Sequence, residues 1–201
     1  VRLPPNSSIP RESITPLFAS LCYSVDPLVF EIVGTENAVW MQWVVSEEDA
    51  PALSEQMQAH FPDVKLGKPA SALSEMLAEA EDMTIVDFGL AEPFMLPLAG
   101  VKNDPFVTLV GALSSLLAGE IGLYQVILTP LSDPWAESGL AAVTKSDGKP
   151  FFDDGVHLAK AAQQKLHGSL YGVVVRLAAA GGDDERSWQI VRGMASALRH
   201  F

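Results

Sequence analysis

The densest group of chemically capable side chains in this sequence is Asp153, Asp154 and His157, in the order Asp-Asp-x-x-His. Two carboxylates and an imidazole one helical turn apart could bind a divalent metal ion and support a metal-dependent hydrolase. No second histidine follows at a suitable spacing, because His167 lies ten residues further on. Alternatively, Asp153 or Asp154 caps a helix that carries His157 on its surface. The pattern favours the capping interpretation, and we assign no metal site.

The motifs that bind nucleotides or activate nucleophiles are missing from the sequence. Gly67-Lys68-Pro69 and Gly148-Lys149-Pro150 lack the upstream glycine and the following hydroxyl of a phosphate-binding loop, and no GxGxxG occurs. No GxSxG motif is present, and Cys22 lies among apolar residues rather than beside a base. The carboxylate pairs Glu47/Glu48 and Asp183/Asp184 stand where helix N-termini favour negative charge. We therefore predict no catalytic residue and no cofactor, and expect that this chain is not an enzyme on its own.

The composition is that of an acidic chain with a large apolar fraction. Its 201 residues are 48% hydrophobic, enough for a sizeable core, and carry a formal net charge of −12. The acidic balance argues against direct nucleic-acid contact, because phosphate binding needs clustered lysine and arginine. No apolar run reaches the ~20 residues of a membrane-spanning helix, so we expect no membrane insertion by this chain. A single cysteine fits a cytoplasmic setting, and the start at Val1 suggests part of a longer protein.

The stretch from Asp104 to Trp135 shows most clearly which elements the chain forms. Asp104 can cap a helix that begins at Pro105, apolar residues then recur at helical spacing, and a β-rich run follows from Ile121 to Leu128. The order helix, strand, strand, helix occurs twice in the chain. The first copy uses 14–24, 28–33, 39–45 and 47–60, and the second uses 106–118, 121–128, 170–178 and 184–201.

That order is the centre of a βαββαβ unit, so the sequence predicts an α+β fold of two ferredoxin-like units. The first unit spans 1–68 and can take its outer strands from Val1–Leu3 and Val64–Leu66. A linker at 69–103 holds an acidic helix at 71–81 and extended segments at 84–88 and 93–98. The second unit spans 104–201, carries a long insertion at 132–169, and has no candidate for its last strand.

Four residues are candidates for an interface with another protein: Trp40, Gln125, Trp135 and Arg176. Trp40 and Trp43 differ by an odd number of positions along one strand, so they face opposite sides of a sheet, and Trp40 is the candidate anchor. Gln125 and Arg176 each interrupt an apolar strand, where a polar side chain either faces solvent or joins a partner's surface. Trp135 marks the point where the insertion leaves its strand.

The chain from Leu28 to Phe201 resembles the region ahead of the motor in certain bacterial type IV secretion and conjugative DNA-transfer ATPases. The family's E…Q…P…W pattern matches Glu120, Gln125, Pro130 and Trp135, its K…(V/I)R(L/V) strand matches Lys165 with Val175-Arg176-Leu177, and a helix ending in QxxFP matches Gln58 to Pro62. The resemblance implies a parent protein that hydrolyses ATP to move DNA or another substrate through a membrane-associated complex. This chain lacks the Walker motifs of that family, so no catalytic residue carries over.

The resulting hypothesis is a non-catalytic assembly or regulatory region of a larger secretion or DNA-transfer ATPase, which is oligomeric in full length and acts through protein–protein contacts. Two alternatives stay open. One is a ferredoxin-like sensor that binds a small ligand between its repeats. The other is the metal-dependent hydrolase built on Asp153, Asp154 and His157.

Overall fold

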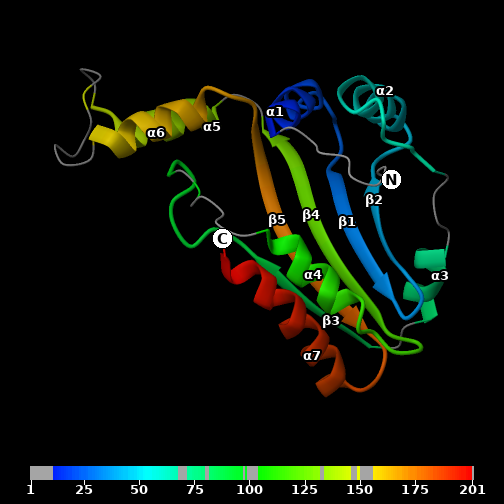
Figure 1. Cartoon of the computed structure of the whole chain (residues 1–201). Helices are drawn as coiled ribbons and strands as arrows, with labels where there is room; N and C mark the ends of the chain where they lie inside the picture. The colour runs from blue at the N-terminus through cyan, green and yellow to red at the C-terminus, as the bar shows by residue number, and fades with distance from the viewer. Residues whose placement is uncertain are drawn as a thin grey trace.

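The computed structural model describes residues 11–67, 72–79, 82–96, 98, 104–131, 134–145, 149 and 156–200. It has an α+β architecture built on a five-stranded sheet with the order β2-β1-β4-β5-β3 (Figure 1). Each neighbouring pair of strands runs antiparallel. The strands are β1 (Leu28–Thr35), β2 (Val39–Val44), β3 (Met83–Phe88), β4 (Ile121–Leu131) and β5 (Leu170–Ala180).

Seven α-helices and a C-terminal 3₁₀-helix accompany this sheet in the described part of the chain. No helix there has the length and apolar character needed to cross a lipid bilayer. The helices are α1 (Arg11–Ser20), α2 (Ala50–His60), α3 (Ala72–Glu79), α4 (Pro105–Leu113), α5 (Trp135–Val143), α6 (Val156–Leu166) and α7 (Asp184–Ala195), followed by the 3₁₀-helix η2 (Ser196–His200).

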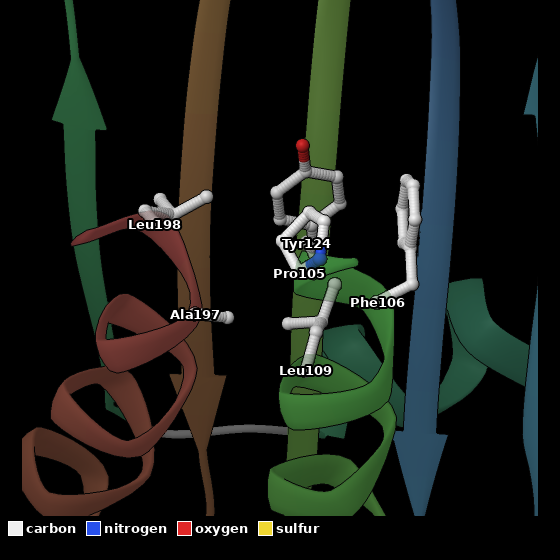
Figure 2. A pocket seen from close by; sticks show the side chains of 6 residues that line it. All are labelled: Pro105, Phe106, Leu109, Tyr124, Ala197 and Leu198. Atoms are coloured by element: carbon white, nitrogen blue, oxygen red, sulfur yellow. The ribbon is translucent and has the colours of Figure 1, made fainter. Parts of the chain in front are cut away.

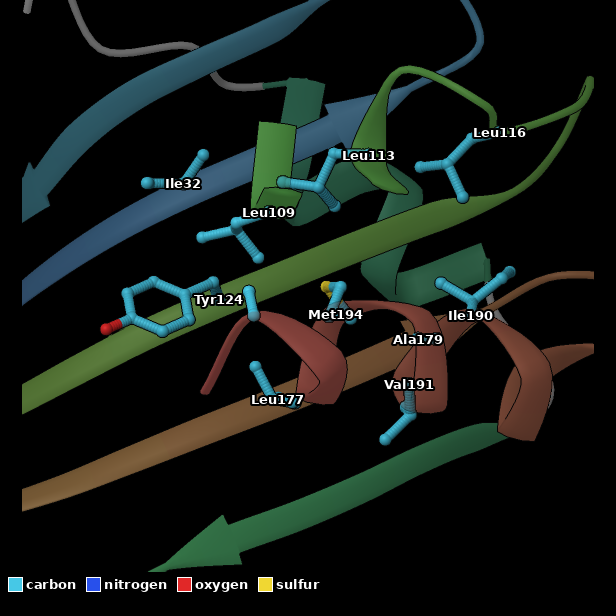
Figure 3. Close-up of a cluster of buried hydrophobic side chains, with 11 residues drawn as sticks. Ile32, Leu109, Leu113, Leu116, Tyr124, Leu177, Ala179, Ile190, Val191 and Met194 are labelled. Carbon is cyan, nitrogen blue, oxygen red and sulfur yellow. The ribbon is translucent and has the colours of Figure 1, made fainter. Parts of the chain in front are cut away.

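One face of the sheet, the covered face, carries most of these helices. Helices α4 and α7 pack over one half of it, and Figure 3 shows their side chains against Ile32, Tyr124 and Leu177. Helices α1 and α2 cover the other half and pack through Leu17 and Leu53 onto the strands. Because side chains alternate along a strand, the residues between these positions point to the opposite side, the open face.

Two glycines let helix α4 approach the covered face closely. Gly34 and Gly122 lie opposite each other on β1 and β4. A Cβ added at Gly34 would lie 2.7 Å from Leu113 Cβ, and one at Gly122 would lie 2.5 Å from Leu113 Cδ2. Leu113 is fully buried, so it fills the space that the two absent side chains leave.

A partly buried ion pair joins the turn after α4 to the start of α7. Glu120 is 4% exposed and accepts two hydrogen bonds from Arg186, at 2.7 and 2.9 Å. It also accepts a hydrogen bond from the backbone N–H of Leu117 at 2.8 Å. The bonds from Arg186 hold the pKa of Glu120 below its ordinary value near 4.5. The pair therefore ties together two elements that pack on the covered face.

Strands β4 and β5 extend past β1 and β3 as a two-stranded ribbon that leads into helices α5 and α6 (Figure 1). Residues just after β3 contact this pair of helices. Phe94 meets the Trp135 ring edge to face at a centroid distance of 5.6 Å. Lys165 Nζ donates hydrogen bonds to the carbonyl oxygens of Phe94 and Leu96, at 2.6 and 2.8 Å.

The strands of both predicted repeats belong to this one sheet. The extended segment predicted at 93–98 is wrong, because 93–96 form a turn that Lys165 binds. Val64–Leu66 adds no strand to the sheet, and Val1–Leu3 lies outside the described residues. The predicted insertion at 132–169 contains helices α5 and α6.

Candidate interaction face

A row of five polar side chains crosses the open face of the sheet, one on each strand. The strand registers place Glu31 opposite Gln42 and Gln125, and Arg176 opposite Gln125 and Asp87. We call these residues the polar row; from edge to edge they are Gln42, Glu31, Gln125, Arg176 and Asp87.

Glu31 lies at the centre of the hydrogen bonding in the polar row. Its side chain is buried, with 4% exposure. Gln42 Nε2 donates to Glu31 Oε2 at 2.6 Å, and Gln125 Nε2 donates to Glu31 Oε1 at 2.5 Å. Each carboxylate oxygen thus receives an amide donor from a neighbouring strand, as a buried polar group requires. The three side chains hold one another in fixed orientations across β2, β1 and β4.

Trp40 extends this network at the β2 edge. Its indole Nε1–H donates to Gln42 Oε1 at 2.9 Å. The ring packs beside the cluster formed by Val33 and the apolar side of α3. Trp43 directly follows Gln42 in the sequence but points to the other side of the strand, where it packs with α1 and α2 on the covered face. The prediction that the two tryptophans face opposite sides is confirmed.

Arg176 and Asp87 close the polar row at the β3 edge. The guanidinium donates from Nε and Nη2 to the two carboxylate oxygens of Asp87, at 2.7 and 2.9 Å. These hydrogen bonds lower the pKa of Asp87 and raise that of Arg176. The pair is solvent-exposed, so it adds little to stability but presents a fixed, planar group to a partner.

The structure brings together three of the four predicted interface residues. Trp40, Gln125 and Arg176 lie on the open face, within or next to the polar row. Trp135 does not join them, because it lies on α5 against Phe94, with 50% of its surface exposed.

Glu31, Gln42 and Asp87 belong to the polar row but are not among the four predicted interface residues. Each is a polar residue that interrupts an apolar strand, as Gln125 and Arg176 do. The same signal could therefore have found them, but only the register shows that all five lie in one line. The row arises from the pairing of five strands, and no single sequence motif encodes it.

Outside the polar row, the described residues offer His157, from the predicted metal cluster, and an apolar depression on the covered face. Among the described residues, no group of three or more His, Cys, Asp or Glu side chains could hold a metal ion. Asp153 and Asp154 lie outside the described residues, and His157 lies exposed on α6.

A shallow depression on the covered face is lined by apolar groups, with the Tyr124 hydroxyl as its polar side chain (Figure 2). Its lining residues are Pro105, Phe106, Leu109, Tyr124, Ala197 and Leu198.

Comparison with protein-family models, with curated proteins and with solved structures found no match to this chain.

Proposed function

We propose that this chain is a non-catalytic assembly or regulatory region of a larger secretion or DNA-transfer ATPase, and that it acts through protein–protein contacts made by the open face. The observation that carries the proposal is the polar row, with Trp40 at one end and the Arg176–Asp87 pair at the other. Tryptophan and arginine are the residue types that most often anchor protein interfaces.

The hydrogen bonding of the polar row suits a binding surface. Gln42 and Gln125 are already oriented by Glu31, and Arg176 is oriented by Asp87. A partner that docks here loses less side-chain entropy than on a surface of freely rotating side chains. Side chains that are held in place in this way support a protein contact surface, and no substrate is needed to explain their arrangement.

The arrangement around β3 supports a ferredoxin-like second unit. Apart from the insertion that holds α5 and α6 between β4 and β5, the elements follow in the order β3, α4, β4, β5, α7, and β5 lies between β3 and β4 in the sheet. Helices α4 and α7 pack together on the covered face. In a ferredoxin-like unit a fourth strand would follow α7 and pair with the outer edge of β3. We propose that another segment of the parent protein, or a partner, supplies this strand.

The residues that carry the resemblance have identifiable places in the structure. Gln125 and Arg176 belong to the polar row, and Glu120 forms the partly buried pair with Arg186. Lys165 and Trp135 both contact the segment after β3. The pattern of the family therefore falls on positions that organise this fold or its open face, which supports the proposed relationship.

The first test is the parent reading frame together with a binding measurement. We expect a phosphate-binding loop motif to be encoded in the same reading frame, and its absence would contradict the proposal. The chain and the ATPase-bearing remainder of the parent should form a complex in isothermal titration calorimetry. Arg176→Glu should weaken that complex at least tenfold, whereas Arg192→Glu, the same change on α7 next to Trp188, should not. Absence of any complex would overturn the proposal.

A further inference from the structure

A second row of side chains lies beside the polar row on the open face, and all four of its members are apolar and β-branched. The registers place Val29 opposite Val44 and Ile127, and Ile127 opposite Val174. We call these residues the valine row; in order across the sheet they are Val44, Val29, Ile127 and Val174. Val44 is 46% and Val174 37% exposed, and the two central members are half-buried.

The polar row separates the valine row from a region of the same face that a helix already covers. On that other side, Val33, Leu123 and Ala178 form a buried cluster with Leu73 of α3, and Met76 and Leu77 pack against it. Helix α3 thus shows how apolar residues of this face are buried. Among the described residues no helix covers the valine row in the same way.

There is room for a second helix beside α3. Val29 and Val33 are four residues apart on β1, which corresponds to about 13 Å along a strand. Two helices pack at roughly 8–10 Å, so a helix over the valine row would not collide with α3. The row crosses four strands, or about 14 Å at the usual strand spacing, which a helix of roughly ten residues spans.

The charge around the valine row points to a basic occupant. Among the residues of the five strands, Arg176 is the one basic side chain, and Asp87 already engages it. Exposed carboxylates lie at the end of the sheet where the valine row runs: Asp26 stands just before β1, and Glu47 and Glu48 follow β2. These three carboxylates give the end of the sheet beside the valine row an acidic character, and we call them the acidic rim.

We infer that the valine row binds an amphipathic, basic helix of another protein. Apolar side chains at helical spacing would cover Val44, Val29, Ile127 and Val174, and flanking lysine or arginine side chains would meet the acidic rim. Polar groups of that helix would reach Gln42, Gln125 and the Asp87–Arg176 pair. This inference rests on the proposed function, because it names the partner chemistry of the same contact surface.

The test uses the whole chain and a fluorescein-labelled 14-residue peptide of leucine and lysine, with the leucines on one helical face. A matched peptide carries glutamate in place of each lysine, and fluorescence anisotropy at 150 mM salt measures both. The lysine peptide should bind at least tenfold more tightly than the glutamate peptide. Equal binding of the two peptides, or no binding of either, would overturn the inference.

Paired variants show whether binding occurs at the valine row. Val44→Lys with Val174→Lys should weaken lysine-peptide binding at least tenfold. Val107→Lys with Val110→Lys adds the same charge to exposed positions of α4 and should change it less than twofold. A similar loss of lysine-peptide affinity in both double variants would mean that the net charge of the chain alone drives binding, which would overturn the inference. If the lysine substitutions prevent folding, the double variant Val44→Ser with Val174→Ser takes their place. Unchanged affinity of that variant for the lysine peptide would equally refute the inference.

Other occupants give different outcomes. If residues 1–10 of this chain occupy the valine row, deleting them should increase peptide affinity several-fold, which would overturn the inference of an external partner. If a second copy of this chain occupies the valine row, Val44→Lys with Val174→Lys should convert a dimer to a monomer in mass photometry. That result would overturn the inference of another protein. If the ATPase-bearing remainder binds both double variants equally while the peptide distinguishes them, the inference stands with a separate protein as the partner, and the Arg176→Glu measurement alone decides the proposed function.

Discussion

Individual residues in this fold have distinct structural and surface roles. Glu120 and Glu31 are both buried carboxylates, yet their partners differ. Glu120 is neutralised by Arg186, which fixes the junction between α4 and α7. Glu31 is held by two amides and faces the open side of the sheet. The first arrangement serves the folded core, and the second shapes a surface.

The Glu120–Arg186 pair leads to a prediction about stability and its pH dependence. Arg186→Met leaves the buried carboxylate without its cation and should lower the free energy of unfolding by about 2–3 kcal/mol at pH 7. Since the pKa of Glu120 is lowered in the folded state, its contribution is present above pH 4.5 and is lost as the pH falls through the lowered value.

Urea unfolding from pH 7 to pH 3 measures this effect. The difference between wild type and Arg186→Met should be largest at pH 7 and should shrink below pH 4.5. Arg192→Met, which removes an exposed guanidinium of α7 near Trp188, is the control and should change stability by less than about 0.5 kcal/mol. A constant difference across the pH range would show that the ion pair is not its cause.

At the level of elements, the approach of α4 to the sheet depends on the absence of side chains at Gly34 and Gly122. Gly122→Ala places a methyl group 2.5 Å from Leu113 Cδ2, so we expect a loss of about 1–3 kcal/mol in denaturant unfolding. The cost should be smaller in a Leu113→Ala background, where the clashing atom is gone.

Gly111→Ala is the matched control for that prediction. Gly111 lies on α4 with nothing within 4 Å of an added Cβ. Alanine favours a helix over glycine by about 1 kcal/mol, so this variant should be as stable as wild type or more stable. Equal destabilisation by Gly111→Ala and Gly122→Ala would contradict the close-packing explanation.

The sequence predicted local elements well where the pattern and the packing agree. Asp104 caps α4 as expected, because its side chain accepts a hydrogen bond from the N–H of Phe106. The helix ends earlier than predicted, at Leu113, and Leu116 then turns into the core. The backbone near Leu117 is held there by Glu120, a tertiary contact that apolar spacing alone does not reveal.

Longer-range features were harder to predict for a physical reason. The segment after β3 is apolar enough for a strand, but Lys165 takes the carbonyls of Phe94 and Leu96 that a neighbouring strand would otherwise bind. The polar row depends on a register between Glu31 and Gln125, which lie on different strands far apart in the chain. The sequence showed Gln125 and Arg176 as exceptions to an apolar pattern, but not what they face.

At the scale of the whole molecule, the two sides of the sheet are unequal. Helices α1, α2, α4 and α7 bury the covered face, whereas α3 covers part of the open face. The polar row and the valine row lie next to each other on the remainder. Their combination of fixed polar groups, apolar surface and an acidic rim is suited to a specific protein contact.

The central claim is that the polar row exists for binding rather than for folding. Replacing a complete polar group by apolar residues of similar size is often neutral or stabilising, because no buried partner is left unsatisfied. The one donor left outside the group is the Trp40 indole N–H, which belongs to a half-buried side chain. The triple variant Glu31→Leu, Gln42→Leu, Gln125→Leu should therefore unfold at the same denaturant concentration as wild type or a higher one.

The most direct test is the dissociation constant of this triple variant for the ATPase-bearing remainder of the parent protein, measured by isothermal titration calorimetry beside the wild-type chain. Binding at least tenfold weaker, with stability retained, is the result that we predict. Unchanged affinity in a folded triple variant would contradict the claim that the open face is the contact surface.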